Sequence, residues 1–281
     1  MKVIGIGDNV VDKYEHIRTM YPGGNALNFA VYAKRLGVEA AFLGAFGTDC
    51  EAAHVQESIQ EIGLDTSHCK VYEGENGCAR VTLKDGDRVF IGSNRCGVLR
   101  EQGLNLTSGD LSYIKEFDLV HTGLYGFTEP ELARIKELDV PIGFDFSSDF
   151  TENHVNEIVP FVDYAYFSCS HLKTDEMLNL MLKVTKMGCK LVLCTMGEKG
   201  ALLFDGDKFY VQEPKLVKAI DTMGAGDSFI TCFMVNYISQ IKEGILEQDQ
   251  IITMSLEKAA VFSSQQCLDD GSFGYGKVYD W

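Results

Sequence analysis

The chain has 281 residues and a formal net charge of −16; 46% of its residues are hydrophobic and 23% are charged, which is typical of a soluble globular protein. It has no run of Lys and Arg, which argues against a nucleic-acid partner, and no apolar stretch of the roughly 20 residues that span a membrane. The nine cysteines show neither a CxxC pair nor zinc-ligand spacing, so we expect a cytoplasmic protein with reduced thiols, bound to neither nucleic acid nor membrane.

Short apolar runs alternate with longer helical patterns along most of the chain. In order, these patterns predict a strand at Val3–Gly7, a helix at Asn25–Leu36, a strand at Ala40–Ala45, a helix at Cys50–Ile62, a strand at Leu119–Thr122, a helix at Glu129–Leu138, strands at Ile142–Phe146 and Tyr164–Ser168, a helix at Thr174–Met187, strands at Lys190–Thr195, Ala201–Phe204 and Phe209–Gln212, and helices around Phe229–Ile241 and Gln248–Ser264. The alternation predicts βαβ units, and therefore a mostly parallel sheet with helices on both faces.

The segment Val71–Gly97 breaks this alternation. It has no helical period, and apolar and polar residues alternate on either side of Asp85-Gly86, a pair that favours a hairpin turn. The segment could be an edge meander of the main sheet or a lid over a cleft, and its charged, turn-rich composition favours the lid. We therefore expect one domain over residues 1–281, with a lid of about residues 13–22 and 69–98 inserted in it.

The stretch "DTMGAGDSF", Asp221–Phe229, stands at the start of the first of the two last helices. Its glycines leave backbone amides free at the positive end of a helix dipole, where an anion binds well. Asp227 falls in the first helical turn, where a carboxylate can accept a proton from an attacking hydroxyl. The alternative is a plain helix-entry turn, in which Asp227 only stabilises the helix. Because no Lys follows the glycines, the stretch is not a Walker A loop.

Four stretches, in this order, resemble the motifs of the ribokinase-like (PfkB) carbohydrate kinases. They are "IGDNVVDKY" at Ile6–Tyr14, "GGNALNFAVYAKRLG" at Gly23–Gly37, "TMGEKG" at Thr195–Gly200 and "DTMGAGDSF" at Asp221–Phe229. The resemblance implies a three-layer α/β fold, in which helices flank a mostly parallel central sheet, plus a small β-sheet lid. It also implies an enzyme that transfers a phosphoryl group from ATP to a sugar, with Mg²⁺ as cofactor.

The resemblance assigns the phosphoryl-transfer roles to the last of these stretches. Asp227 would be the catalytic base, and the amides of Gly224, Ala225 and Gly226 would form the anion hole. The residues expected to contact the nucleotide are Thr195, Gly197 and Gly200, together with Gly224 and Gly226. The pair Asp221 and Thr222 matches the loop that holds a monovalent cation in the family, so K⁺ is an additional expectation.

The sugar would bind to the first two stretches. The residues implied by the resemblance are Asp12, with Asp8 as its neighbouring rival, Gly23, Gly24 and Asn28. Either aspartate could instead cap a loop, and Asn25 could be the N-cap of the helix that follows. His121 and Tyr125, at the end of a predicted strand, could line the same pocket or belong to the core.

The sequence departs from the family pattern at two places. Many relatives carry an NxxE motif that orders water around Mg²⁺, but the equivalent stretch here, Phe167–Glu176, has no Asn; Asp175 and Glu176 are the candidate substitutes. Relatives also often carry DxNxR after a central strand, whereas Asp145–Phe150 has no Arg. A catalytically silent sugar-binding relative is therefore an alternative, which the intact Asp227 motif disfavours.

Several stretches further resemble the fructoselysine 6-kinase group of the family, among them "IGDNVVD", "VHTGLYG" and "FDFS". The implied substrate is a fructosamine, a ketose joined to an amine, phosphorylated on its 6-hydroxyl. Its charged arm needs partners, and the candidates for binding a carboxylate are Arg80, Arg88, Asn94 and Arg95. A fructokinase, ribokinase or nucleoside kinase is the alternative within the family. As in some relatives, the lid could also join two copies into a homodimer.

Overall fold

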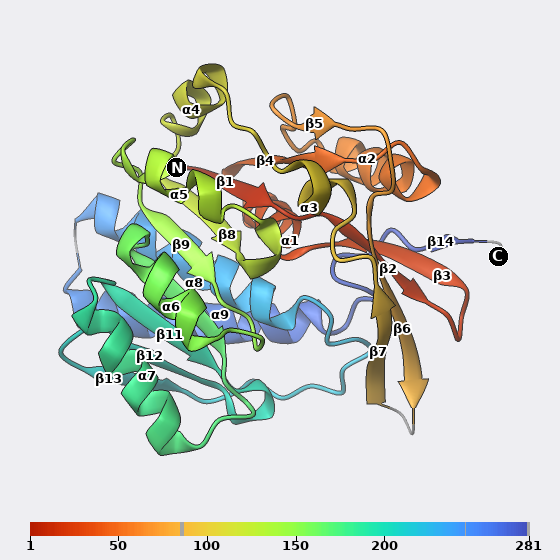
Figure 1. Ribbon diagram of the computed structural model, residues 1–281. Coiled ribbons are helices and arrows are strands. Elements are labelled where there is room, and N and C mark those ends of the chain that lie inside the picture. The colour runs from red at the N-terminus through yellow and green to blue at the C-terminus, as the bar shows by residue number, and fades with distance from the viewer. Residues whose placement is uncertain (85–86, 245, 280–281) are drawn as a thin grey trace.

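The computed structural model describes residues 1–84, 87–244 and 246–279, without the side chains of residues 83, 84, 87 and 88. The hairpin turn predicted at Asp85-Gly86 and the side chain of Arg88 therefore lie outside the described residues. The described chain forms a large sheet between helices and a second, smaller sheet beside it (Figure 1).

The larger sheet has nine strands in the order β13-β12-β11-β10-β9-β8-β1-β4-β5. Their bounds are β1 (Lys2–Gly7), β4 (Glu39–Phe46), β5 (Lys70–Val71), β8 (Leu119–Gly123), β9 (Ile142–Asp145), β10 (Tyr164–Ser168), β11 (Leu191–Thr195), β12 (Ala201–Phe204) and β13 (Phe209–Gln212). All neighbours pair in parallel except β11 with β12 and β12 with β13. The predicted mostly parallel sheet is confirmed.

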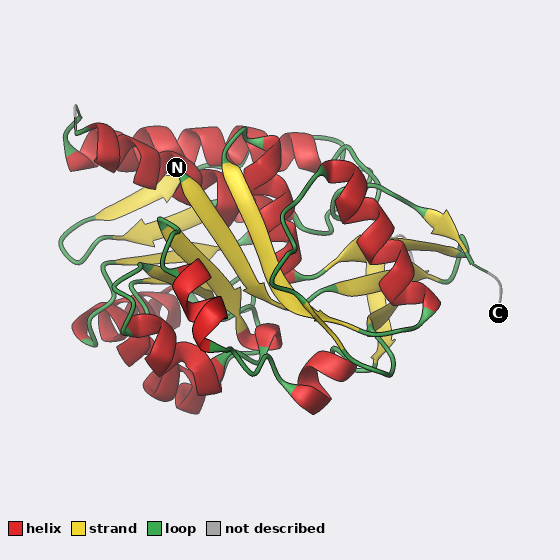
Figure 2. Cartoon of the chain, turned by 90° about the horizontal axis from the view of Figure 1, so that it is seen from above, coloured by secondary structure: helices red, strands yellow, loops and turns green. Residues whose placement is uncertain are grey.

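Helices cover both faces of this sheet (Figure 2). Their bounds are α1 (Asn25–Arg35), α2 (Cys50–Ile62), α3 (Val98–Gln102), α4 (Ser108–Ile114), α5 (Leu132–Lys136), α6 (Glu152–Ile158), α7 (Thr174–Lys186), α8 (Ala225–Glu243) and α9 (Gln248–Gln266). The first core packs α1, α2, α8 and α9 on the sheet, and the second packs α3 to α7. Strands buried on both faces have nearly continuous apolar sequences, so most strands of this sheet could be predicted from the sequence.

The prediction for Glu129–Leu138 was too simple. The segment begins as a 3-10 helix, η2 (Glu129–Glu131), and becomes α-helical only over α5. Pro130 stands in the first turn of η2 and has no amide hydrogen, so it marks the start of a helix rather than its interior. Three short helices, α3, α4 and α6, were not predicted because each is only five to seven residues long.

The smaller sheet has the order β14-β3-β2-β6-β7, and its strands are β2 (Val10–Tyr14), β3 (Thr19–Gly23), β6 (Gly77–Lys84), β7 (Asp87–Ser93) and β14 (Lys277–Val278). It draws together the two segments expected to form a lid, and it adds a strand from the far end of the chain. Neighbouring residues of β2 point to opposite faces. Lys13 pairs with Glu51 of α2, whereas the hydroxyl of Tyr14 on the other face donates to Asp221.

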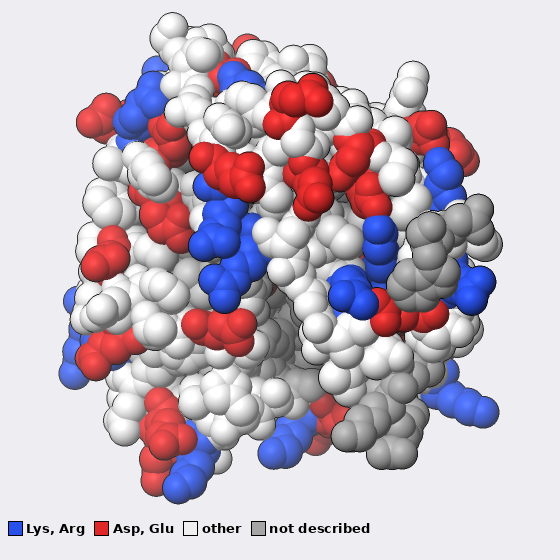
Figure 3. All heavy atoms as spheres, turned by 45° about the vertical axis from the view of Figure 1, so that its right-hand side comes forward, with Lys and Arg blue, Asp and Glu red and all other residues white. Residues whose placement is uncertain are grey.

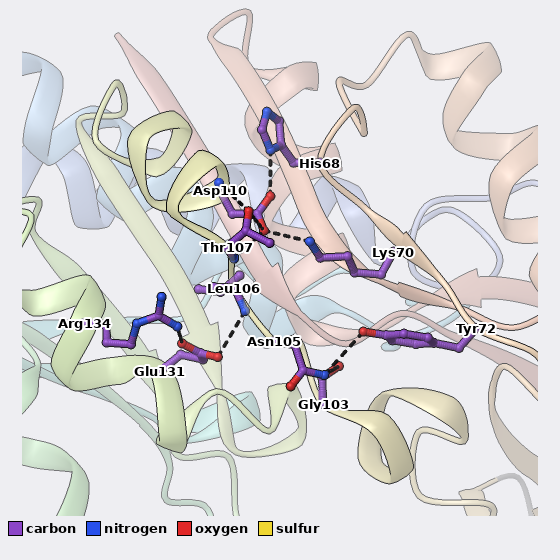
Figure 4. Close-up of polar contacts among 10 residues, drawn as sticks. All are labelled: His68, Lys70, Tyr72, Gly103, Asn105, Leu106, Thr107, Asp110, Glu131 and Arg134. Carbon is purple, nitrogen blue, oxygen red and sulfur yellow. Dashed lines mark hydrogen bonds and ion pairs between the residues drawn. The ribbon is translucent and has the colours of Figure 1, made fainter.

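The edge strand β5 is fastened to α4 by Asp110. The Nδ1 atom of His68 lies 2.8 Å from Asp110 Oδ1, and Lys70 Nζ donates to Oδ2 at 2.7 Å (Figure 4). Burial alone would raise the pKa of Asp110, but the bonds from Lys70 and His68 hold it well below its usual range. The same carboxylate forms a capping box with Thr107, so this cluster is a structural clamp at the edge of the sheet.

The surface carries both signs of charge. On the face drawn in Figure 3, Lys and Arg side chains are interspersed with Asp and Glu, and no broad basic area appears on that face. Among the helices that the structure describes, none is long and apolar enough to span a membrane.

Candidate active site

Three of the predicted site residues and one further carboxylate lie at or near the carboxyl ends of parallel strands. Asp8 follows β1, His121 lies in β8, Asp145 is the last residue of β9, and Thr195 is the last residue of β11. Ligands of open α/β sheets bind at this edge. The smaller sheet begins here too, because β2 starts at Val10.

The amino end of α8 carries the three residues predicted to form the anion hole. Gly224 is the N-cap with φ of 72°, and a Cβ atom there would lie 2.3 Å from the Tyr32 hydroxyl oxygen, so only glycine fits. At Gly226 a Cβ atom would meet no atom within 4 Å, so the space in front of this turn is open. The amide of Ala225 donates to the carbonyl of Thr222 at 3.2 Å, whereas in the described part of the chain the Gly226 amide has no backbone acceptor.

Asp227 is held by two asparagines from one face of α1. Asn25 Nδ2 donates to Asp227 Oδ1 at 2.8 Å, and Asn28 Nδ2 donates to Oδ2 at 2.6 Å. Residues three apart on a helix share a face, so α1 presents both amides to one carboxylate. Burial raises the pKa of Asp227 to about 6, although the bonds from Asn28 and Asn25 act in the opposite direction. A carboxylate with such a pKa suits a general base near neutral pH.

A second carboxylate stands beside this pair. Asn25 Nδ2 also donates to Asp145 Oδ2 at 2.8 Å, and His121 Nε2 lies 3.0 Å from Asn25 Oδ1. Burial, and next the negative charge of Asp227, raise the pKa of Asp145 to about 7. Burial lowers the pKa of His121 to about 3, so its ring is neutral. Asp145 was not among the predicted site residues, and no contact between Asn25 and the base was predicted.

Asp8 caps a helix. Its Oδ2 accepts from the amide of Asn25 at 2.7 Å and its Oδ1 from the amide of Ala26 at 3.1 Å, and the side chain is 3% exposed. The N-cap of α1 is Gly24, with φ of 114°, and a Cβ there would lie 2.8 Å from Asn9 Cα. The cap residue therefore has no side chain of its own, and Asp8 replaces it.

Asp12 and Asn28 flank a small space beside Gly23. A Cβ atom at Gly23 would lie 2.8 Å from Asp12 Oδ2, 3.3 Å from Ser272 Oγ and 3.9 Å from Asn28 Oδ1. Asp12 is 5% exposed and belongs to β2 of the smaller sheet, while Asn28 belongs to the body. Among the described residues, the buried Asn28 Oδ1 has no hydrogen-bond partner. Such a buried acceptor calls for a donor, and a sugar hydroxyl is a suitable one.

The loop after β11 carries the residues expected at the nucleotide. Thr195 ends the strand half-buried, and η4 (Gly197–Lys199) follows. Gly200 has φ of 86°, and a Cβ there would lie 2.0 Å from the carbonyl oxygen of Gln212, so glycine is required for this turn. Gly197 has φ of 59° with no atom within 4 Å of a Cβ, which leaves its backbone accessible.

Asp221 is buried and accepts several hydrogen bonds. The Tyr14 hydroxyl donates to Oδ2 at 2.5 Å, the amide of Gly271 donates to the same oxygen at 3.0 Å, and the amide of Met223 donates to Oδ1 at 2.9 Å. Thr222, its predicted partner at a cation, is exposed. The carboxylate thus ties the loop before α8 to the smaller sheet and to the loop at Gly271.

Two of the residues expected at a charged substrate arm, Arg80 and Asn94, line the same pocket. Arg80 pairs with Glu15, and Asn94 accepts from the amide of Cys78 at 2.9 Å, so both have partners within the smaller sheet. Arg95 is exposed, with φ of 54°. The Tyr125 hydroxyl donates to Asp149 at 2.7 Å.

The two substitutes considered for the magnesium motif lie at the start of α7. Glu176 accepts from the amide of Lys173 and so caps this helix, and Asp175 is exposed. Within the described residues, no three His, Cys, Asp or Glu side chains converge to hold a metal ion. Mg²⁺ in phosphate chemistry is bound largely by phosphates and water, so one or two carboxylates suffice.

Comparisons with known proteins identify the family of the chain. The family model described as "pfkB family carbohydrate kinase" matches residues 2–266. The chain belongs to this family. It is 40% identical to the fructosamine kinase FrlD of Bacillus subtilis, over 99% of this chain and 95% of that protein. It is 34% identical to the fructoselysine 6-kinase of Escherichia coli, over 83% of this chain and 87% of that protein.

Solved structures show which fold the chain has. The ribokinase of Giardia lamblia superimposes with a TM-score of 0.81 over 98% of this chain and 94% of that chain, at 17% identity. The predicted ribokinase-like fold is therefore confirmed. As a member of the family, the protein is an ATP-dependent carbohydrate kinase, and the family uses ATP with Mg²⁺.

Proposed function

We propose that this kinase transfers the γ-phosphate of ATP to the 6-hydroxyl of a fructosamine such as fructoselysine. The observation that carries the proposal is the similarity to two kinases named for fructosamine and fructoselysine, over most of the chain. A zwitterionic or cationic substrate also suits a site whose buried side chains include the carboxylates of Asp12 and Asp145.

In the proposed mechanism Asp227 is the base. Its carboxylate takes the proton of the 6-hydroxyl as that oxygen attacks the γ-phosphorus, the bond from that phosphorus to the β,γ-bridging oxygen breaks, and ADP leaves. The amides at Gly224 to Gly226 would face the transferring group and stabilise its charge. The pKa of about 6 keeps Asp227 ionised at neutral pH and close enough to it to act as an acceptor.

Further residues take proposed supporting roles. Asp12, Gly23, Gly24 and Asn28 would bind the sugar, with His121 and Tyr125 behind it, and Thr195, Gly197 and Gly200 would contact the nucleotide phosphates. Asp8 remains a candidate sugar ligand, although both its oxygens accept amides of α1. Mg²⁺ would neutralise charge on the phosphates. A K⁺ ion at Asp221 and Thr222 remains a prediction. Asp221 already accepts three hydrogen bonds, with which K⁺ would share the carboxylate oxygens, so activation by K⁺ has to be measured.

The smaller sheet is proposed as a lid over the sugar, since Asp12 reaches the site from it. Arg95 is its exposed candidate for a substrate carboxylate.

The edge strand β7 of the smaller sheet exposes Val89, Phe90 and Ile91 by 36%, 60% and 44%. An unpaired apolar edge is a surface for another chain, so we propose that a homodimer forms here.

A substrate panel tests the proposed function. ADP formation would be measured with fructoselysine, other fructosamines, fructose, ribose and adenosine, each with ATP and Mg²⁺. We expect kcat/KM to be highest for a fructosamine. Equal values on plain fructose would contradict the fructosamine assignment, and binding of a sugar without ADP formation would identify a silent relative. NMR of the product shows which hydroxyl carries the phosphate and so tests whether it is the 6-hydroxyl.

A further inference from the structure

Asn25 stands at the centre of the polar contacts around Asp227, and the proposed mechanism gives it no part. One of its amide hydrogens points to Asp227 and the other to Asp145, both at 2.8 Å. A side-chain amide has two donor hydrogens, so both are used. Its carbonyl oxygen must then accept, which makes Nε2 of His121 the donor at 3.0 Å.

We propose that Asn25 and Asp145 are positioning residues for phosphoryl transfer. Asp145 orients the Asn25 amide, and that amide turns the carboxylate of Asp227 toward the attacking hydroxyl. The inference rests on the proposed role of Asp227 as the base. It gives a function to a buried carboxylate for which the sequence predicted no role.

The parts that hold Asn25 are rigid. Asp145 ends β9, which is paired with β8 and β10, and its Oδ1 accepts from the amide of Ser147 at 2.7 Å. The His121 ring is buried and stacks on Phe29 with ring centroids 4.2 Å apart. A Cβ atom at Gly123 would lie 2.8 Å from Asn25 Oδ1, so the chain leaves this space for the amide. A site on such supports holds its geometry well.

The charges around Asp227 make the amide bonds important. The titratable groups facing it are Asp8 before β2, Tyr32 on α1 and Asp145 on β9, with His121 on β8 behind Asn25. In the described part of the chain, no Lys or Arg donates a hydrogen bond to any of the three aspartates. The ionised base therefore depends on the amides of Asn25 and Asn28. Removing Asn25 should raise the pKa of Asp227, whereas removing the charge of Asp145 should not.

Three variants of the 281-residue chain test the proposal: Asn25→Ala, Asp145→Ala and Asp145→Asn. The matched control is Asn236→Ala on the far part of α8, where Nδ2 donates to the carbonyl of Cys232. For each we would measure kcat, KM for sugar and ATP, the pH profile of kcat/KM, and the melting temperature. The sugar is whichever member of the panel the wild type phosphorylates fastest.

We expect Asn25→Ala and Asp145→Ala to lower kcat about 10- to 100-fold while KM for ATP changes less than about threefold. The acid limb of Asn25→Ala should move to higher pH. Asp145→Asn should keep more activity than Asp145→Ala, because its amide oxygen can still accept from Asn25. Asn236→Ala should behave as wild type.

Two results would overturn the proposal. One is a kcat within about twofold of wild type for both alanine variants. The other is a loss that follows the melting temperature alone, with an unmoved pH profile and no rescue by Asp145→Asn. Both are distinct from failure of the proposed function, which would appear as retained turnover in Asp227→Asn. An inactive Asp227→Asn beside fully active alanine variants leaves the base in place and rejects the positioning role.

Discussion

Helices α1 and α8 have similar amino-terminal turns, but their first amides have different contacts. Each has a glycine with positive φ as its N-cap, Gly24 at 114° and Gly224 at 72°, and neither has a side-chain cap of its own. At α1 the first amides donate to the buried carboxylate of Asp8. At α8 the described structure places no carboxylate on the Gly226 amide, and the space before it is open.

Under the proposed mechanism, the carboxylate at the start of α1 is structural, whereas the start of α8 binds a ligand. Both helix ends present amides at the positive end of a dipole, where negative charge is stabilised. At α1 the carboxylate of Asp8 occupies the first amides. At α8 the acidic side chain of the first turn, Asp227, accepts from Asn25 and Asn28 instead, which leaves the Gly226 amide for the phosphoryl group of the proposed mechanism. Substitutions at the two helix ends test this difference.

The largest effect is expected for Asp227→Asn. The amide cannot accept the proton of the hydroxyl, and general-base catalysis is worth about 100- to 10,000-fold, so kcat should fall by at least about 100-fold. Nucleotide binding, measured by calorimetry with ADP, should stay near wild type. A variant that keeps more than a few per cent of the rate would show that Asp227 is not the base.

Alanine substitutions at two glycines of the same turn should both lower kcat but should have different effects on the melting temperature. In Gly224→Ala the new methyl group meets the Tyr32 hydroxyl, and φ of 72° is strained for alanine, so both the melting temperature and kcat should fall. In Gly226→Ala nothing in the protein blocks the methyl group, and a helical Gly→Ala change stabilises by about 0.5–1 kcal/mol.

If the space at Gly226 receives the phosphoryl group, Gly226→Ala should melt at the same or a higher temperature and yet lose about 10-fold or more in kcat. Thermal melting and steady-state kinetics on the two variants check this. Unchanged kinetics in a stable Gly226→Ala protein would remove the anion hole from this position.

The sequence revealed the local features of both helix ends but not what each amide contacts. The glycine punctuation at Gly63 and the apolar periods placed α1 and α2 well. The motif favoured Asp12 over Asp8 as the sugar ligand, but only the fold shows that Asp8 caps α1 and that Asp12 lies in β2. Asn25 meets residues 120 and 202 positions away, and no local pattern encodes such contacts. The two-residue strand β14 was too short to leave any pattern.

A smaller effect is expected at the closed helix end. Asp8→Ala removes the acceptor for two amides of α1, and loss of a cap costs about 1–2 kcal/mol of unfolding free energy. Urea unfolding measures this, and kcat of the remaining folded protein should change little. A raised KM for the sugar at unchanged stability would instead make Asp8 a substrate ligand.

The smallest effect is in the pH dependence of stability. Burial raises the pKa of Asp227 to about 6 from an ordinary value near 3.8, so the folded protein holds this proton more tightly than the unfolded chain. The stabilisation from the bound proton is complete below about pH 4 and is lost as the pH rises through 6. Asp227→Asn does not ionise, so its melting temperature minus that of wild type should increase from pH 4 to pH 8. Burial also raises the pKa of Asp8, against the opposing hydrogen bonds from the amides of Ala26 and Asn25, so Asp8→Asn should show a rise of the same sign. A difference that is flat with pH for Asp227→Asn would mean that the carboxylate is not held in a raised-pKa environment, which would also weaken its case as a base near neutrality.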